Sequence, residues 1–432
     1  MCKMWTVRNN STKIGKFSIV AALLLVLLAM PASSFADKKN KKQAAATPAS
    51  TQPSKPQYDY SKLVWPGPPN IPRIRYVNYM AGQKFDYTPA AQQPKQKQSW
   101  MDRLAGTQPE KDKKLKQMPF QLLGPYGMSS DSKGNLFVAD QRVGAIFVFN
   151  TETRDASLIR NRFEATLGLP NAVAVDDDDR LFISDGKLHR VLILNPKHEV
   201  VDQIKEGLVD PVGLTIDTEN RLLYVADTQL DQVVVFDADT LKKVRTIGTT
   251  GRNHELTTPG DFAGPTGVAL DKDGNLYVTD TMNNRVEIFD GDGKFISQFG
   301  QHCDSYGCFA HPKGIALDSD GHIWVADPML DLLQIFNRDG QLLAFVGGHG
   351  SLPGQFSSLV DVYIDKQNRV FTSEQYPGRV QMFRYITDAE ADKLKQEKEQ
   401  QRATERAVRT QPAAAQAAEA KTPETKPEEK KE

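Results

Sequence analysis

The feature that most constrains the fold of this 432-residue chain is a segment that recurs six times between residues 125 and 374. Each copy has a short apolar run, a turn rich in Asp, Asn or Gly, and a second apolar run that ends in an acidic residue. The copies are PYGMSSDSKGNLFVAD (125–140), PNAVAVDDDDRLFISD (170–185), PVGLTIDTENRLLYVAD (211–227), PTGVALDKDGNLYVTD (265–280), PKGIALDSDGHIWVAD (312–327) and LVDVYIDKQNRVFTSE (359–374). A further apolar run follows each copy, and the copies start about 40 to 55 residues apart. This period is typical of one four-stranded antiparallel propeller blade per copy.

The repeat resembles the NHL-repeat family, in the form found in secreted bacterial proteins. The resemblance covers residues 120–386 and depends on the Pro-x-Gly start, the D-x-x-G turn and the Y-V-A/T-D strand end, with an N-x-R element at 283–286. It implies an all-β fold, a six-bladed β-propeller of NHL-type repeats. Ala172 and Asp361 replace the glycine of Pro-x-Gly. The family's arginine is kept at Arg190, Arg285 and Arg379 and is replaced at Ala145, Gln232 and Leu332.

The last repeat lacks a fourth strand, because only YITDAEADK follows its third apolar run. A lead-in at 58–119 contains WPGPPNIPRIRYVNYMAG, in which prolines favour extended chain and residues 73–80 alternate like a strand. We therefore predict that strand 73–80 completes the sixth blade on its outer edge and closes the ring. A free proline-rich linker is the alternative.

The chain ends outside the repeats differ from its centre. Residues 1–36 combine a basic start, the apolar run Phe17–Met30 and small residues before Asp37, which predicts a cleaved signal peptide and a periplasmic or extracellular protein. A retained signal anchor is the alternative. We expect no membrane span after cleavage, disorder over 37–57, and a tail at 387–432 that is helical and then disordered.

Charge is unevenly distributed although the whole chain is neutral. Residues 120–386 hold 24 Lys and Arg against 37 Asp and Glu, and the flanks are basic. Because binding to nucleic acid depends on neutralising phosphates, an acidic body argues against a nucleic-acid partner.

Two sets of acidic residues recur in the repeat. The turn set is Asp131, Asp176, Asp217, Asp271, Asp318 and Asp365. The strand-end set is Asp140, Asp185, Asp227, Asp280, Asp327 and Glu374. A residue that recurs in every blade is expected to do the same structural work in each, such as accepting backbone N–H bonds in turns. Calcium binding by such a ring, or by Asp176–Asp179, is the alternative.

On a propeller, His189, His254, His302, His311 and His349 are expected on one face, and His198 and His322 on the other. No histidine lies on an innermost strand, so we predict no metal site and no cofactor, with zinc or calcium as the alternative. The binding residues predicted on the first face are His189, Arg190, Arg252, His254, His302, His349 and Tyr376.

Cys303 and Cys308 are the cysteines that remain after removal of residues 1–36. Haem attachment requires C-x-x-C-H, whereas the spacing here is C-x4-C followed by Phe309. A zinc site that also uses His302 and His311 is conceivable, but His302 adjoins Cys303 in sequence, which makes joint ligation awkward. We predict a Cys303–Cys308 disulfide that fixes a surface loop.

No nucleophilic triad, phosphate loop or dinucleotide fingerprint is present in the sequence. We therefore predict an exported, non-enzymatic scaffold that binds a protein or an extended ligand through one face. The resemblance to secreted bacterial NHL propellers implies a role beside a multihaem c-type cytochrome in an extracytoplasmic electron-transfer assembly. A metal-dependent lyase or lactonase at the central channel mouth is the alternative, and RNA binding conflicts with export and with the acidic body.

Overall fold

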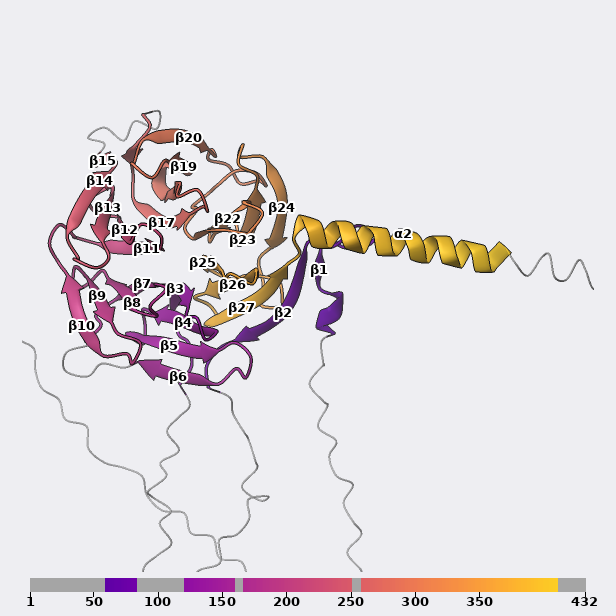
Figure 1. Cartoon of the computed structure of the whole chain (residues 1–432), viewed down its shortest axis with the longest axis horizontal. Helices are drawn as coiled ribbons and strands as arrows, with labels where there is room; N and C mark the ends of the chain where they lie inside the picture. Colours follow the sequence, from indigo (N-terminus) through magenta and orange to yellow (C-terminus); the bar gives the residue numbers. More distant parts are fainter. Residues whose placement is uncertain (1–58, 84–119, 160–165, 251–257, 411–432) are drawn as a thin grey trace, which may run out of the picture. The chain divides into compact units, whose positions relative to one another are not determined.

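The computed structural model describes residues 59–83, 120–159, 166–250 and 258–410, and six β-sheets are arranged in a ring within them (Figure 1). The signal peptide, the 37–57 segment, residues 84–119 and the tail beyond 410 lie outside the described residues. The fold is the six-bladed β-propeller that the repeat predicted. None of the helices in the described part of the chain is long and apolar enough to cross a membrane.

The first three blades are four-stranded antiparallel sheets in sequence order from the channel outward. Blade one contains β3 (Pro125–Ser130), β4 (Asn135–Asp140), β5 (Ala145–Asn150) and β6 (Ala156–Ile159). Blade two contains β7 (Pro170–Val175), β8 (Leu181–Asp185), β9 (Arg190–Leu194) and β10 (Val200–Ile204). Blade three contains β11 (Pro211–Asp217), β12 (Leu222–Asp227), β13 (Gln232–Asp237) and β14 (Lys243–Ile247).

The other three blades follow the same order. Blade four contains β17 (Pro265–Leu270), β18 (Leu276–Asp280), β19 (Arg285–Phe289) and β20 (Phe295–Phe299), with the 3-10 helix η2 (Thr281–Asn283). Blade five contains β21 (Ile315–Leu317), β22 (Ile323–Asp327), β23 (Leu332–Phe336) and β24 (Leu342–Gly347). Blade six contains β25 (Leu359–Ile364), β26 (Arg369–Glu374) and β27 (Arg379–Tyr385). A short parallel pair, β15 (Thr249–Thr250) and β16 (Asp261–Phe262), precedes blade four.

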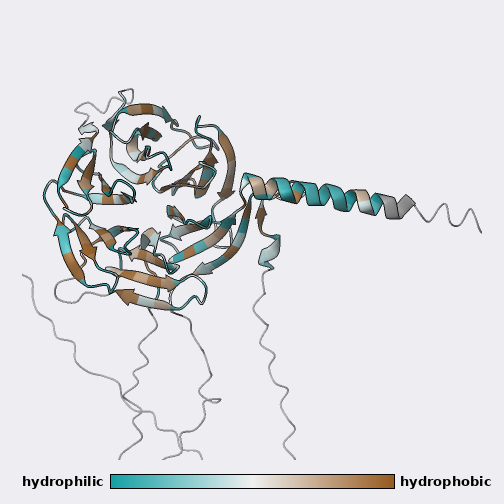
Figure 2. Ribbon diagram, viewed as in Figure 1, coloured by the Kyte–Doolittle hydropathy of each residue, from teal (hydrophilic) through white to brown (hydrophobic). Residues whose placement is uncertain are grey.

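Apolar side chains fill the spaces between neighbouring blades. The second and third strands of each blade are buried on both sides, as in the pattern of β22, and this agrees with their runs of Val, Ile, Leu and Phe. Figure 2 shows these hydrophobic stretches along the blades, whereas most of helix α2 (Asp388–Thr410) is hydrophilic. The innermost strands contact one another around the ring, including β25 with β3, so the ring is closed.

The lead-in closes blade six, where the sequence predicted a strand at 73–80. Strand β2 (Ile74–Met80) pairs antiparallel with β27, and β1 (Val64–Trp65) pairs with β2 outside it, after the 3-10 helix η1 (Tyr60–Lys62). The ring of Tyr76 lies 5.4 Å from that of Phe383, edge to face. Ile74 and Tyr76 are buried by this pairing. The closing strand thus contributes apolar core as well as backbone hydrogen bonds.

Helix α2 starts at a capping box directly after blade six. The N–H of Thr387 donates to Glu390 Oε2 at 3.0 Å, and the N–H of Glu390 donates to Thr387 Oγ1 at 3.3 Å. The backbone N–H of Asp388 donates to Asp320 Oδ2 at 2.8 Å, which ties the helix start to a turn of blade five. The helical part of the predicted tail is therefore present from Asp388 to Thr410.

Two substitutions at Tyr76 separate the apolar and polar contributions of the closing strand. The hydroxyl of Tyr76 is buried with no hydrogen-bond partner among the described residues. Tyr76→Ala is expected to lower the free energy of unfolding by about 3 to 5 kcal/mol, because it removes a buried ring. Tyr76→Phe is expected to change it by less than about 1 kcal/mol, or to raise it, because it deletes an unsatisfied polar group. Denaturant unfolding measures both; an equal loss in the two variants would contradict this packing.

Candidate functional site

Strand order gives the propeller two faces with different chain segments. The loop face carries the loops that lead into each innermost strand and the turns between second and third strands. The turn face carries the turns between first and second strands and between third and fourth strands. The predicted binding residues all belong to segments of the loop face.

A fully buried carboxylate anchors each loop of the loop face. The strand-end set of acidic residues shows no exposed surface in any blade. In blade one, Asp140 Oδ2 accepts the backbone N–H groups of Leu123 and Gly124 at 2.7 and 3.0 Å. Equivalent bonds reach the set from Gly168, Val209, Ala263, Ala310 and Ser357. The structure thus gives these carboxylates a structural role, in agreement with the sequence prediction.

The turn set holds the turn face in a similar way. Asp131 Oδ1 accepts the backbone N–H groups of Lys133 and Asn135 at 3.0 and 2.8 Å, closing an Asx-type turn. The same pattern recurs at Asp271 and at Asp365. These acidic residues are therefore engaged with the backbone.

Blades four to six add a second buried anchor that the sequence analysis missed. The third position of the third strand is Glu287, Gln334 or Gln381, and each is fully buried. Gln334 Oε1 accepts the N–H of Gly307 at 2.7 Å, and its Nε2 donates to the carbonyl of Cys308 at 2.7 Å. Gln381 and Glu287 accept in the same way from Gly354 and Gly260. The signal was a polar residue inside otherwise apolar strands, where blades one to three have Phe147, Leu192 and Val234.

The prediction that Arg190 belongs to a binding surface is wrong. Arg190 is buried, and its guanidinium donates to Gln203 Oε1 at 2.8 Å and to the carbonyl of Thr166. Arg379 does the same for its own loop, donating to Glu374 Oε1 at 2.8 Å and to the carbonyl of Gln355 at 2.9 Å. The repeat's arginine therefore fixes loops from beneath and is not presented to a ligand.

The other predicted binding residues are exposed but do not converge. His189, His302 and His349 lie in loop-face segments of blades two, five and six, and Tyr376 is 67% exposed in the last such turn. His349 Nδ1 lies 2.7 Å from Asp331 Oδ2, and His189 Nδ1 contacts the carbonyl of Val209. Arg252 and His254 fall outside the described residues. Where they are described, these side chains make no contact with one another that would define a single pocket.

The loop that contains the two cysteines is held at several points. Cys303 and Cys308 form a disulfide, with Cα atoms 5.5 Å apart. Phe309 is fully buried next to it, and Asp327 anchors the following residues. Tyr306 at the loop tip stacks on Phe345 with ring centroids 4.1 Å apart, although it is 57% exposed. The loop therefore presents an aromatic side chain from a fixed base.

A single cluster of three metal-ligand candidates occurs in the described ranges, at Asp176, Asp177 and Asp178. The guanidinium of Arg221 contacts all three carboxylates, and it also binds Asp239 at 2.8 Å. Arginine thus already compensates the charge that a cation would neutralise, and the cluster serves to join blades two and three.

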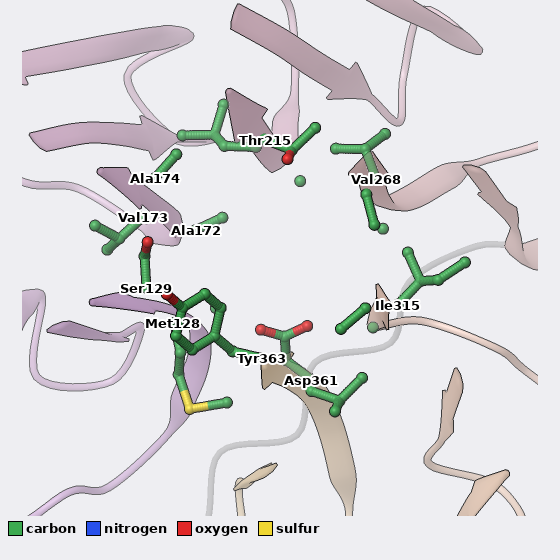
Figure 3. A pocket seen from close by; sticks show the side chains of 18 of the residues that line it. Met128, Ser129, Ala172, Val173, Ala174, Thr215, Val268, Ile315, Asp361 and Tyr363 are labelled. Atoms are coloured by element: carbon green, nitrogen blue, oxygen red, sulfur yellow. The ribbon is translucent and has the colours of Figure 1, made fainter. Parts of the chain in front are cut away.

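The central channel has a cavity of about 250 Å³ lined by the innermost strands. These strands approach closely, because a Cβ at Gly213 would lie 2.2 Å from the Thr266 carbonyl oxygen. One at Gly267 would lie 2.2 Å from the Lys313 carbonyl oxygen, so the repeat's glycine is a packing requirement. Blade six has Asp361 instead, and Figure 3 shows its carboxylate projecting into the channel.

Asp361 differs from every other acidic side chain near the channel. Its carboxylate is surrounded by protein, and this burial raises its pKa to about 7, against the opposing effect of hydrogen bonds from the backbone of Val362 and Met128. Tyr126 and Lys313 line the same end of the cavity, with Lys313 Nζ 5.6 Å from the centroid of the Tyr126 ring. Burial lowers the pKa of Lys313 and raises that of Tyr126. Titratable groups perturbed in this way and gathered in a cavity are typical of functional sites.

Comparison with known proteins connects this geometry to two related repeat families. The family model for the SMP-30/Gluconolactonase/LRE-like region matches residues 170–313, and that for the NHL repeat matches residues 309–327. NHL repeat-containing protein 2 of Homo sapiens is 34% identical over 99 residues, which are 22% of this chain and 14% of the human protein. These matches support an NHL/SMP-30-like propeller.

A probable peptidyl-alpha-hydroxyglycine alpha-amidating lyase of Caenorhabditis elegans is 35% identical over 114 residues, which are 25% of this chain and 31% of the nematode protein. The chain thus spans less than a third of the length of either relative. Among solved structures, virginiamycin B lyase from Staphylococcus aureus is 13% identical with a TM-score of 0.45, covering 61% of this chain and 96% of the lyase. Kuenenia stuttgartiensis hydrazine synthase is 15% identical with a TM-score of 0.46, covering 62% and 97%. At these identities the likeness concerns the fold alone.

Glu287 gives the loop anchors of this NHL/SMP-30-like propeller a measurable pH dependence. Burial raises the pKa of Glu287 from 4.5 to about 7, so the unfolded chain loses this proton first as the pH rises. This carboxyl therefore reduces stability progressively between about pH 4.5 and 7. Glu287→Gln introduces the residue that blades five and six have at this position. The difference in unfolding free energy between pH 5 and pH 8 is expected to shrink by at least about 1 kcal/mol in this variant.

The reciprocal substitution Gln334→Glu is the matched control, measured by the same denaturant titrations at the two pH values. It is expected to add a loss of stability at pH 8. An unchanged pH dependence in both variants would contradict the assignment of these side chains as buried loop anchors.

Proposed function

We propose that this propeller is a non-enzymatic scaffold that binds a protein partner or an extended ligand through its loop face. The observation that carries the proposal is where large apolar side chains are exposed. Eight of them are on the loop face, namely Leu123, Leu169, Leu188, Met282, Tyr306, Met329, Leu352 and Tyr376. The others lie on the outermost strands, and within the described segments none is on the turn face. An apolar set confined to one face is typical of a protein-binding surface.

The anchoring of the loops supports the same proposal. Binding by a mobile surface loses conformational entropy, whereas a surface held in its bound geometry avoids that cost. The loop face is fixed from beneath by six buried carboxylates, and in blades four to six by Glu287, Gln334 and Gln381 as well. Exposed Met282 and Met329, which are 64% and 72% exposed, provide adaptable apolar contacts on this fixed base.

The charge of the propeller favours a basic partner. Residues 120–386 carry 37 acidic against 24 basic side chains, so a positively charged protein would be attracted and a nucleic acid repelled. We propose that the protein is exported by its signal peptide, that the partner is extracytoplasmic, and that a c-type cytochrome is the first candidate. The basis for export is the sequence pattern of residues 1–36, and the basis for the cytochrome is the resemblance to secreted bacterial NHL propellers.

Site-specific photocrosslinking in the cells that make the protein tests the proposal. A photoreactive phenylalanine analogue at Met282, Met329 or Tyr376 is expected to give one discrete adduct, weakened by raised salt because charge contributes. The analogue at Lys366, exposed in a turn-face turn, is the matched control and should give none. Covalent haem in the adduct would support the cytochrome, and a mature chain beginning at Asp37 would support export. Equal adducts from both faces, or none from the loop face, would contradict a partner on this face.

A metal-dependent lyase or lactonase at the channel mouth is the second candidate. It is favoured by the SMP-30/Gluconolactonase/LRE-like match and by the nematode lyase. Such an enzyme needs several metal ligands that converge, whereas Asp361 is the one His, Cys, Asp or Glu among the residues that line the described channel. Elemental analysis of the purified protein separates the candidates: stoichiometric zinc or calcium would favour the enzyme, and its absence would remove this alternative.

A further inference from the structure

Two neighbouring blades depart from the repeat at the loop-face end of the channel. The second position of the innermost segment is Tyr126, Asn171, Val212, Thr266, Lys313 and Val360 in blades one to six. The third position is Gly127, Ala172, Gly213, Gly267, Gly314 and Asp361. Lys313 is the one cation in the first series, and Asp361 is the one charged residue in the second. A Cβ at Gly314 would lie 2.4 Å from Asp361 Oδ1, so the carboxylate occupies the space next to the Lys313 backbone.

Lys313 has an uncompensated charge. Its side chain is half-buried, and it forms no ion pair with a carboxylate of the described chain. The ammonium lies over the Tyr126 ring, and the hydroxyl of Tyr126 has no hydrogen-bond partner within the described ranges. The charged groups around it are Asp361, Asp210, which acts on Tyr126 electrostatically, and His311, which burial keeps neutral by lowering its pKa. A buried cation without an anion is costly, and a bound anion would relieve that cost.

Asp361 adds a group that changes its role with pH. Its pKa is raised to about 7 by burial, so below neutral pH it is largely an acid that can donate a hydrogen bond. Above neutral pH it becomes a carboxylate that repels an anion. The channel end therefore offers one ammonium, one phenol and one carboxylic acid, all as donors, on a wall that is otherwise apolar side chains and backbone edges.

We propose that this end of the channel binds a small monocarboxylate, whose oxygens accept hydrogen bonds from Lys313, Tyr126 and the protonated Asp361. The cavity of about 250 Å³ fits a molecule of a few carbon atoms and is below the usual range for drug-sized ligands. A single ammonium balances one negative charge, which disfavours a phosphate dianion, and it repels cationic ligands. The site goes beyond the proposed scaffold function and would exist whether or not a protein covers the loop face.

Binding of this anion is expected to take up a proton. Because the pKa of free Asp361 is about 7, the acid form falls about tenfold in population between pH 6 and pH 8. If the acid form binds, affinity for a carboxylate that remains ionised throughout this range falls by the same factor. The direction is opposite to that expected from loss of charge on the ligand, which does not titrate here.

Isothermal titration calorimetry with propionate tests the proposal, with propylammonium and 1-propanol as size-matched controls. The full mature protein is expected to bind propionate about tenfold more tightly at pH 6 than at pH 8, with proton uptake detected by changing the buffer's ionisation enthalpy. Lys313→Val, which introduces the residue of blades three and six, should weaken binding at least tenfold. Asp361→Gly, which restores the repeat's glycine, should abolish the pH dependence. Lys366→Val, at an exposed turn-face lysine, should leave binding unchanged.

Each variant's unfolding transition is recorded first, and either channel variant alone is sufficient if the other fails to fold. No propionate binding by the wild type, equal binding by Lys313→Val, or preferred binding of propylammonium would overturn the proposal. Loss of the crosslinked partner with propionate binding retained would instead contradict the scaffold function alone.

Discussion

The loop face of this propeller depends on the hydrogen bond from a loop N–H to a fully buried carboxylate at the end of each second strand. Asp140 and its counterparts through Glu374 receive these bonds in every blade. A buried carboxylate without such donors would be strongly destabilising, and a charge-assisted bond is stronger than a neutral one. The interaction therefore fixes where the chain enters each innermost strand. It also removes these carboxylates from any role as surface ligands, since their oxygens are committed to the backbone.

The two halves of the ring use this anchor differently. In blades one to three, apolar residues such as Phe147 fill the third position of the third strand. In blades four to six, Glu287, Gln334 and Gln381 reach from that position to loop backbone groups. Fixed loops carrying Tyr306 and Leu352 are built on this second half. The surface proposed for partner binding therefore combines a uniform scaffold with blade-specific loops, which is how propellers of one fold acquire different functions.

Much of the fold could be predicted because the repeat reports a periodic constraint six times over. The structural use of the acidic residues followed from the same logic, since a residue present in every blade has the same surroundings in each. The site was harder, because function depends on departures from the repeat. Asp361 was visible as a missing glycine, but its place in the channel requires knowing that the glycine marks strand contact. Arg190 was misassigned because sequence does not distinguish an arginine that points into a loop base from one that points into solvent.

The central claim is that the loop face is held rigid from beneath and so presents a ready-made binding surface. Native-state hydrogen exchange measures this directly at the amides that donate to the buried carboxylates, including those of Gly124, Ala310 and Ser357. The account predicts protection close to that of central strand amides in β22, because exposure requires opening of the blade. Exchange as fast as in the exposed part of helix α2 would contradict it, because the loop face would then be mobile and its apolar residues would have no fixed arrangement.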